Sequence, residues 1–255
     1  MIKKVLTSMG IFTLMFSVSA AVEISSLTHA IDVAGKQRMF TQRMLKDYAM
    51  VGMGNTFGKP QEDLQKIMDA YSDALISLKA YAKTDMIKKA LAEINTLWKP
   101  LQEVLKNKPD IKTVGKLQED LEKLLKASDT VTKMFEKESS QASGEIVNIS
   151  GRQRMLSQRM ASLYMLKVWG VDDPQFKVKL DEALKLFKTS SQKLSHSDLN
   201  NEEINKRLAK VKRSFMFFEM MNRSKSKFIP TLIYKKSNDI LKNMNDVTHL
   251  YVQGK

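Results

Sequence analysis

Two arginines recur in the same fourteen-residue pattern, 116 positions apart. The first copy occupies residues 31–44 (IDVAGKQRMFTQRM) and the second occupies residues 147–160 (VNISGRQRMLSQRM), with seven identical positions. The central arginine is Arg38 in one copy and Arg154 in the other. A planar guanidinium with several N–H donors suits a planar oxyanion. A duplicated helical bundle needs its apolar pattern twice, but it does not need the same arginines twice. The repeated polar residues therefore indicate binding.

On a helix, each central arginine falls on a stripe of otherwise apolar, small or aromatic residues. These stripes are Leu27, Ile31, Ala34, Arg38, Thr41, Leu45 and Tyr48, and Val147, Ser150, Arg154, Ser157, Ala161, Tyr164 and Val168. Second stripes suit the core of each copy: Val33, Gln37, Phe40, Met44 and Val51, and Ile149, Gln153, Leu156, Met160 and Leu163. We therefore expect the arginine stripes of the two copies to pack against each other.

Arg38 and Arg154 would then face each other, and two facing guanidiniums repel unless an anion lies between them. Gly35 and Gly151, one turn earlier, would allow a backbone or a ligand to approach closely. Lys36 and Arg152 keep a positive charge beside each glycine and are expected at the rim of the site. The alternative is that both central arginines reach solvent or pair with an acid.

The second arginine of each pattern has a different expected role. Arg43 and Arg159 lie about 140° around the helix from the central arginines, so we expect them to form structural ion pairs. Tyr48 and Tyr164 are expected to pack in the contact between the two helices. The 17 methionines are interpreted as adaptable core residues rather than metal ligands.

The elements that carry the pattern are helices. Glycine and proline are sparse, and apolar residues recur at spacings of three and four. Eight helices are predicted, at about residues 23–53, 61–81, 85–105, 111–139, 145–169, 174–195, 202–223 and 230–253. Residues 141–144 are predicted either to break the chain or to continue a helix. The likeness between the halves extends past the pattern, so we predict two tandem four-helix bundles, residues 22–141 and 142–255, packed as an internal pseudo-dimer.

The start of the sequence is typical of export. Lys3 and Lys4 precede a short apolar run and a small-residue segment, which predicts a signal peptide over residues 1–21. An uncleaved anchor is the alternative, and no later stretch is long enough to cross a bilayer. We therefore expect an exported, periplasmic protein.

Composition excludes several classes of site. There is no cysteine, so disulfides, thiolate metal sites and thiol catalysis are excluded. The three histidines, His29, His196 and His249, are too far apart in sequence to indicate a metal site. The net charge of +14 suggests a weak general attraction for anions, while export argues against nucleic acid. We expect no metal and no cofactor.

The repeated pattern resembles the signature of PilJ-type, or NarX-like, sensor domains, which are the extracytoplasmic domains of type IV pilus chemotaxis transducers and of nitrate/nitrite sensor kinases. Residues 240–251 resemble the last helix of that family, so the resemblance covers nearly the whole mature chain as two copies. It implies a four-helix bundle that binds nitrate or nitrite at a dimer interface. The implied ligand residues are Arg38 and Arg154, with Gly35 and Gly151 at the adjoining backbone. Unlike the usual member, the sequence shows no later membrane span and no output domain.

Three functions compete. The first is a periplasmic protein that binds a small oxyanion and presents its bound state to a membrane receptor. The favoured oxyanions are nitrate and nitrite. The second is a ligand-free module that docks on a membrane chemoreceptor or sensor kinase. An enzyme is the weakest, because no nucleophile, phosphate-binding loop or clustered acid–base residues are evident.

Overall fold

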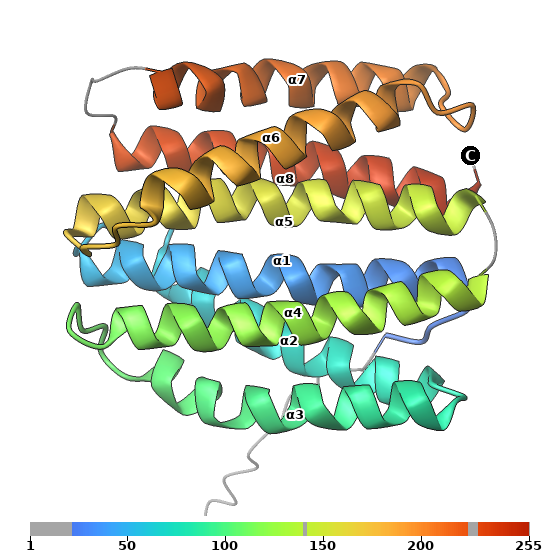
Figure 1. Cartoon of the computed structure of the whole chain (residues 1–255), viewed down its shortest axis with the longest axis horizontal. Helices are drawn as coiled ribbons and strands as arrows, with labels where there is room; N and C mark the ends of the chain where they lie inside the picture. The colour runs from blue at the N-terminus through green and yellow to red at the C-terminus, as the bar shows by residue number, and fades with distance from the viewer. Residues whose placement is uncertain (1–21, 140–141, 224–228, 255) are drawn as a thin grey trace, which may run out of the picture.

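Helices follow one another along the whole chain in a computed structural model that describes residues 22–139, 142–223 and 229–254 (Figure 1). Within these ranges there are eight: α1 (Leu27–Gly52), α2 (Pro60–Tyr81), α3 (Asp85–Lys106), α4 (Val114–Ser139), α5 (Ala142–Trp169), α6 (Phe176–Ser195), α7 (Glu202–Arg223) and α8 (Pro230–Gln253). The all-α prediction is confirmed. The predicted signal peptide, residues 1–21, lies outside the described residues.

Local capping chemistry sets the ends of several helices. The Oγ of Ser26 accepts a hydrogen bond from the backbone N of His29 at 3.1 Å and caps α1. Pro60 occupies the first position of α2, where a missing N–H costs nothing. Gly54 and Gly170 follow α1 and α5 at equivalent places and take φ values of 68° and 95°. A positive φ favours glycine, so both ends follow directly from the sequence.

Three helices begin later than predicted. They start at residues 27, 114 and 176 instead of about 23, 111 and 174. Asp110 explains the second case, because its backbone oxygen accepts from Thr113 and Val114 in a turn before α4. Asp173 explains the third, because its side chain accepts from the backbone N of Gln175. In the opposite direction, α5 starts at residue 142, so the helix continues through residue 144 rather than breaking there.

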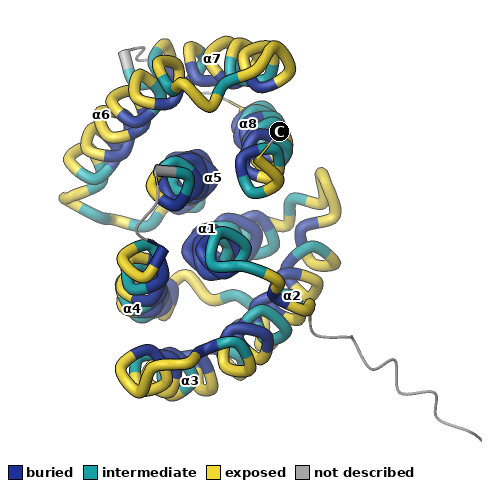
Figure 2. Tube along the Cα trace, turned by 90° about the vertical axis from the view of Figure 1, so that its right-hand side faces the viewer, coloured by how far each residue is buried: buried dark blue, intermediate teal, exposed yellow. Residues whose placement is uncertain are grey.

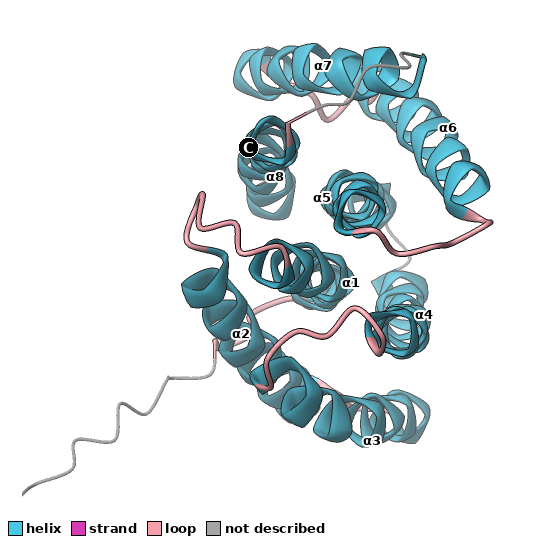
Figure 3. Ribbon diagram, turned by 90° about the vertical axis from the view of Figure 1, so that its left-hand side faces the viewer, coloured by secondary structure: helices cyan, strands magenta, loops and turns pink. Residues whose placement is uncertain are grey.

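The two halves of the chain form two helical layers that meet at their first helices (Figure 1). Helices α1–α4 lie on one side and α5–α8 on the other, with α1 and α5 side by side in the middle (Figures 2 and 3). The α1–α5 contact is the most extensive between any two helices, followed by α1 with α4 and α5 with α8. Buried side chains of both halves form one continuous hydrophobic cluster. The predicted contact between the first helices of the two halves is therefore confirmed.

The second stripe of each pattern also lies where it was predicted. Val33, Gln37, Phe40 and Met44 are buried, whereas Val51 near the end of α1 is half-buried. Phe40 meets Tyr71 of α2 edge-on at 6.5 Å between ring centroids. All five residues of the second copy's stripe are buried. Each first helix is thus buried on two faces, one within its own bundle and one against the other bundle. Within the described residues, none of the helices combines the length and the apolar character that crossing a membrane requires.

Among the glycines of α1 and α5, Gly52 leaves the least room for a side chain. A Cβ atom on Gly52 would lie 2.2–2.6 Å from three ring carbons of Trp169, which itself meets Tyr48 edge-on. We expect Gly52→Ala to displace that ring and to lower the free energy of unfolding by about 1–3 kcal/mol, with a red shift of tryptophan fluorescence. Urea unfolding followed by fluorescence measures both effects.

Gly115 of α4 provides the matched control, because a Cβ atom there would meet nothing within 4 Å. Gly115→Ala should stabilise the chain by about 0.5–1 kcal/mol through helix propensity. Equal effects of the two alanines would contradict the close approach of Trp169 to Gly52.

Candidate functional site

The two central arginines meet in the buried contact between α1 and α5. Arg38 is 0% exposed and Arg154 is 1% exposed. A Cβ atom on Gly35 would lie 3.2 Å from Nη2 of Arg38 and 3.5 Å from Nη2 of Arg154. On Gly151 the same distances would be 3.1 Å to Arg154 and 3.4 Å to Arg38. The two guanidiniums therefore lie next to each other over two helix surfaces that lack side chains, and the structure brings all four predicted ligand residues together.

Each guanidinium has partners, which the sequence analysis did not assign. Nη1 of Arg38 donates to Oδ1 of Asp129 on α4 at 2.5 Å, and Nη2 donates to the backbone oxygen of Asn148 at 3.3 Å. The expectation that the central arginines lack acidic partners is therefore wrong, because Asp129 pairs with Arg38 and Asp32 pairs with Arg154, and the alternative of pairing with an acid is confirmed. The sequence could not supply this contact, because Asp129 is 91 residues away from Arg38.

Arg154 repeats this arrangement with different chemistry. Its Nη1 donates to Oδ1 of Asn245 on α8 at 3.3 Å, and its Nη2 donates to the backbone oxygen of Asp32 at 3.4 Å. The same Nη2 lies 2.7 Å from Oδ1 of Asp32. Among the described residues, Arg154 forms one ion pair, and its carboxylate partner Asp32 belongs to the other half of the molecule. Asp129 and Asn245 are 116 positions apart, as are Asp32 and Asn148, so the contacts obey an approximate two-fold relation.

We call Arg38, Arg154 and the side chains that pair with them the arginine layer. Its acids belong to the first half, and amides stand at the equivalent positions of the second half. Asp32 corresponds to Asn148 and Asp129 corresponds to Asn245, both at the offset of 116 residues. Glu122 of α4, which binds the next polar layer, corresponds in the same way to Asn238. The first of these differences is visible in the repeated pattern itself. The other two lie in helices where the repeat is too diverged to be noticed without the contacts.

The arginine layer holds more cations than carboxylates. Lys36 lies 2.9 Å from Asp32, and Lys133 lies 2.7 Å from Asp129, so each acid is shared by two cations. Burial, opposed by Asp129, lowers the pKa of Arg38 to about 10, with further lowering by Arg152 and Arg154. Four cations (Lys36, Arg38, Lys133, Arg154) thus share two carboxylates (Asp32, Asp129).

The carboxylates of the layer are held in their ionised form. Burial by itself would raise the pKa of Asp129, but the charges of Arg38 and Lys133 and their hydrogen bonds hold it below its usual value. Arg154 and Lys36 do the same for Asp32 against the effect of burial. Both acids are therefore charged at neutral pH, and the arginine layer keeps a positive excess.

The predicted rim residues have separate roles. Lys36 is half-buried and its ammonium is engaged by Asp32. Arg152, also half-buried, acts on Arg38 through its charge. Tyr48 and Tyr164 are buried, and Tyr48 meets Trp169 of the other half at 6.2 Å between ring centroids, so its packing in the contact is confirmed.

The second arginines of the pattern form structural ion pairs, as predicted. Arg43 donates through Nε and Nη2 to both carboxylate oxygens of Asp63 at 2.5–3.0 Å. Arg159 donates to both oxygens of Glu122 at 2.7 Å and so ties α5 to α4 of the other half. Gln42 also donates to Glu122, at 2.9 Å. These arginines therefore lie outside the candidate anion site.

A buried lysine and aspartate form a second titratable group in the contact between the halves. Nζ of Lys46 donates to Oε1 of Gln158 at 2.8 Å and to Oδ1 of Asn238 at 2.9 Å. Asp47 lies 3.7 Å from that ammonium, and neither of its oxygens accepts a hydrogen bond from any described residue. A protonated Asp47 would instead donate to Asp63. The sequence signal for this pair was the presence of two adjacent charged residues, Lys46 and Asp47, in the helix that carries the repeated pattern. The pair was not predicted.

Metal chemistry finds no support in the part of the chain that the structure covers. No group of three or more His, Cys, Asp or Glu residues there could hold a metal ion. The arrangement instead offers two adjacent, buried guanidiniums with a local excess of positive charge. Guanidinium N–H groups are donors that suit an oxyanion acceptor.

Comparison with known proteins identifies the repeat. The pattern of the family described as "Type IV pili methyl-accepting chemotaxis transducer N-term", PilJ, matches residues 23–130 and again residues 137–215. The two matches contain Arg38 and Arg154 respectively, so each half contributes one arginine to the central layer. No curated protein and no solved structure matches the chain.

The Lys46–Asp47 pair predicts a distinctive dependence of stability on pH. Burial raises the pKa of Asp47 from 3.8 to about 8, so between these values the folded chain keeps a proton that the unfolded chain has lost. Stability from this group is complete below about pH 4 and is lost as the pH rises to 8. Burial lowers the pKa of Lys46 from 10.5 to about 8, so its penalty is relieved only above pH 8.

We expect Asp47→Asn to remove the decline between pH 5 and pH 8. The variant should gain stability relative to the native chain with rising pH, by at most about 1.4 kcal/mol per pH unit. Urea unfolding at pH 5, 6.5 and 8 measures the difference. Glu93→Gln on the exposed face of α3 is the control and should leave the profile parallel to that of the native chain. A parallel profile for Asp47→Asn as well would contradict a protonated Asp47.

Proposed function

Because the chain belongs to the PilJ family, the N-terminal domains of type IV pili methyl-accepting chemotaxis transducers, we propose that it is a sensory protein that binds a small oxyanion between Arg38 and Arg154. The favoured ligands are nitrate and nitrite. We further propose that residues 22–141 and 142–255 are the two sensory units and that residues 1–21 direct the chain to the periplasm. No catalytic step is part of this proposal.

Unused hydrogen-bond donors support the proposal most directly. Nε of Arg38 and Nε of Arg154 are buried, and within the described residues neither has a hydrogen-bond acceptor. Both guanidiniums also make one long contact, 3.3–3.4 Å, to a backbone oxygen. A buried donor without an acceptor costs about 1–3 kcal/mol, so an acceptor that reaches both arginines would be favourable.

The geometry of the layer favours a small, planar, singly charged ligand. Gly35 and Gly151 keep Cβ atoms away from the two Nη2 atoms, and Ala34 and Ser150 are small neighbours. A planar oxyanion can accept two parallel hydrogen bonds from each guanidinium. Asp32 and Asp129 already offset most of the arginine charge, so one further negative charge fits the local balance better than two or three.

The ion pairs themselves favour a second candidate function. Arg154 with Asp32 joins the two bundles without any ligand, and Asp129 neutralises Arg38 within the first bundle. The chain would then act as an interaction module that docks on a membrane chemoreceptor or sensor kinase. The two candidates differ in one observable, which is whether the folded chain responds selectively to a small anion.

We expect nitrate or nitrite, and not chloride or sulfate, to raise the melting temperature at constant ionic strength. A ligand at 100 times its Kd stabilises the folded state by about 2.7 kcal/mol, and each kcal/mol raises the Tm by about 2–4 °C in a chain of this size. The paired variant Arg38→Gln with Asp129→Asn removes one guanidinium and its acid together and should abolish the response.

The control keeps the number of charges the same as in that variant. Arg207 pairs with Asp246 outside the arginine layer, so Arg207→Gln with Asp246→Asn should preserve the nitrate response. A native chain that shows no selective rise would sink the anion proposal. In that case chemical cross-linking in membranes should capture a chemoreceptor or sensor kinase, and failure to capture one would count against the interaction module.

A further inference from the structure

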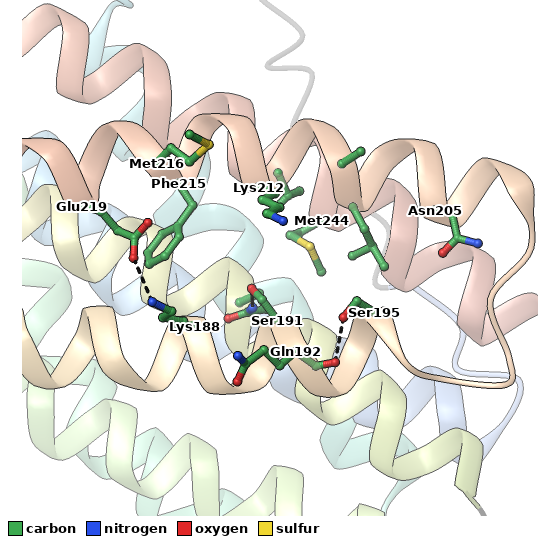
Figure 4. A pocket seen from close by; sticks show the side chains of 14 residues that line it. Lys188, Ser191, Gln192, Ser195, Asn205, Lys212, Phe215, Met216, Glu219 and Met244 are labelled. Atoms are coloured by element: carbon green, nitrogen blue, oxygen red, sulfur yellow. Dashed lines mark hydrogen bonds and ion pairs between the residues drawn. The ribbon is translucent and has the colours of Figure 1, made fainter.

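A cavity that Arg38 and Arg154 do not line lies between α6 and α7 (Figure 4). Its volume is about 420 Å³, which is in the range of cavities that hold small organic molecules. Figure 4 shows Lys188, Ser191 and Gln192 coming from α6 and Phe215 and Met216 coming from α7. The cavity belongs wholly to the second half of the molecule, so it does not depend on the contact between the halves.

Two of the side chains that line this cavity are smaller than their counterparts in the first half. Ser191 corresponds to Leu75 of α2, which is buried, at the offset of 116 residues. Phe215 corresponds to Trp98, which is buried in the first half and donates through Nε1 to Ser72 at 3.1 Å. Two others, Lys188 and Met244, are larger than their counterparts Ser72 and Ser128, so the lining of the cavity differs between the two copies.

The walls of the cavity are mainly apolar. Leu208, Val211, Phe215 and Met244 line it, and Phe215 stacks on Phe187 at 4.3 Å between ring centroids. A flat apolar group of a ligand can pack against the part of the Phe215 ring that does not face Phe187. The ligand class that these walls fit is thus a small molecule with an aromatic or other flat apolar body.

One buried acceptor points to a polar group on that ligand. Gln153 is 0% exposed and lines the cavity. Its Nε2 donates to the backbone oxygen of Phe187 at 3.0 Å and to Ser191 at 2.5 Å, which fixes the amide orientation. Its Oε1 is left without a hydrogen-bond donor from the described part of the chain. A ligand hydroxyl or amine would satisfy this oxygen.

Charge at the mouth of the cavity favours an acid. Lys188 on α6 lies 3.6 Å from Glu219 on α7, so its charge is partly offset (Figure 4). Lys212 also lines the cavity and forms no ion pair with any described residue. The remaining positive charge is therefore on Lys212, beside the opening.

From these contacts we propose that the cavity binds a small aromatic carboxylic acid that carries a hydroxyl group. Its ring lies against Phe215 and Met244, its hydroxyl donates to Oε1 of Gln153, and its carboxylate meets Lys212. The site shares no residue with the arginine layer, so it stands whether or not an oxyanion binds there.

Isothermal titration calorimetry of the full chain with 4-hydroxyphenylacetate tests the proposal. Binding should weaken with phenylacetate, which lacks the donor for Gln153, and with 4-hydroxybenzyl alcohol, which lacks the charge for Lys212. Ser191→Leu restores the larger residue found at the equivalent position of the first half and should weaken binding by about tenfold or more, because it occupies the cavity.

Two further variants keep the test decisive. Thr189→Leu places the same side chain on the exposed face of α6 and should bind like the native chain. Lys212→Gln on the surface should weaken binding of the acid by about two- to fivefold and leave the alcohol unchanged. The rise of the melting temperature in nitrate should be identical in Ser191→Leu and the native chain. Loss of ligand binding in the cavity is therefore distinguished from loss of anion binding at the arginine layer.

Three results would overturn the proposal. The first is no measurable binding of 4-hydroxyphenylacetate by the native chain. The second is equal binding by Ser191→Leu and Thr189→Leu, which would place the ligand elsewhere. The third is equal affinity for the acid and the alcohol, which would remove the role of Lys212 and leave only unspecific apolar association.

Discussion

Two guanidiniums buried side by side between α1 and α5 are the constraint on which the rest of this structure depends. Removing an arginine from water is costly, and a second positive charge beside it adds to that cost. The molecule meets the cost with the carboxylates of Asp129 and Asp32, and Gly35 and Gly151 leave room because they lack side chains. These residues come from α1, α4 and α5, so the layer combines groups from both bundles.

The two halves have become unequal around this layer. Asp32 and Asp129 of this layer, and Glu122 of the next polar layer, each have an amide at the equivalent position of the second half. Arg154 therefore obtains its carboxylate from the first half, and Arg159 does the same through Glu122. A pair of identical second halves would contain the arginines without the acids. The asymmetry explains in physical terms why the two units belong together in one chain.

Divergence has acted on the cores as well as on the contact between the halves. In the first bundle, Leu75 and Trp98 fill the space between the second and third helices. In the second bundle, Ser191 and Phe215 leave a cavity there, with a buried amide oxygen at Gln153. Gln153 directly precedes Arg154, so the cavity and the arginine layer lie on adjacent residues of one helix. The same duplication has thus given the chain one site between its halves and a different one within a half.

The sequence by itself determined the eight helices, the duplication and the face on which the halves meet, because these depend on periodicity and on local capping. Gly54 and Gly170 end their helices for reasons within a few residues, and the apolar stripes around Arg38 and Arg154 require a helical partner. Only the tertiary structure decided which groups neutralise the arginines, since Asp129 and Asp32 reach them from 91 and 122 residues away. It also decided the burial that raises the pKa of Asp47, and the cavity beside Gln153. Both depend on burial, and burial is a property of packed helices that no spacing of residues within one helix specifies.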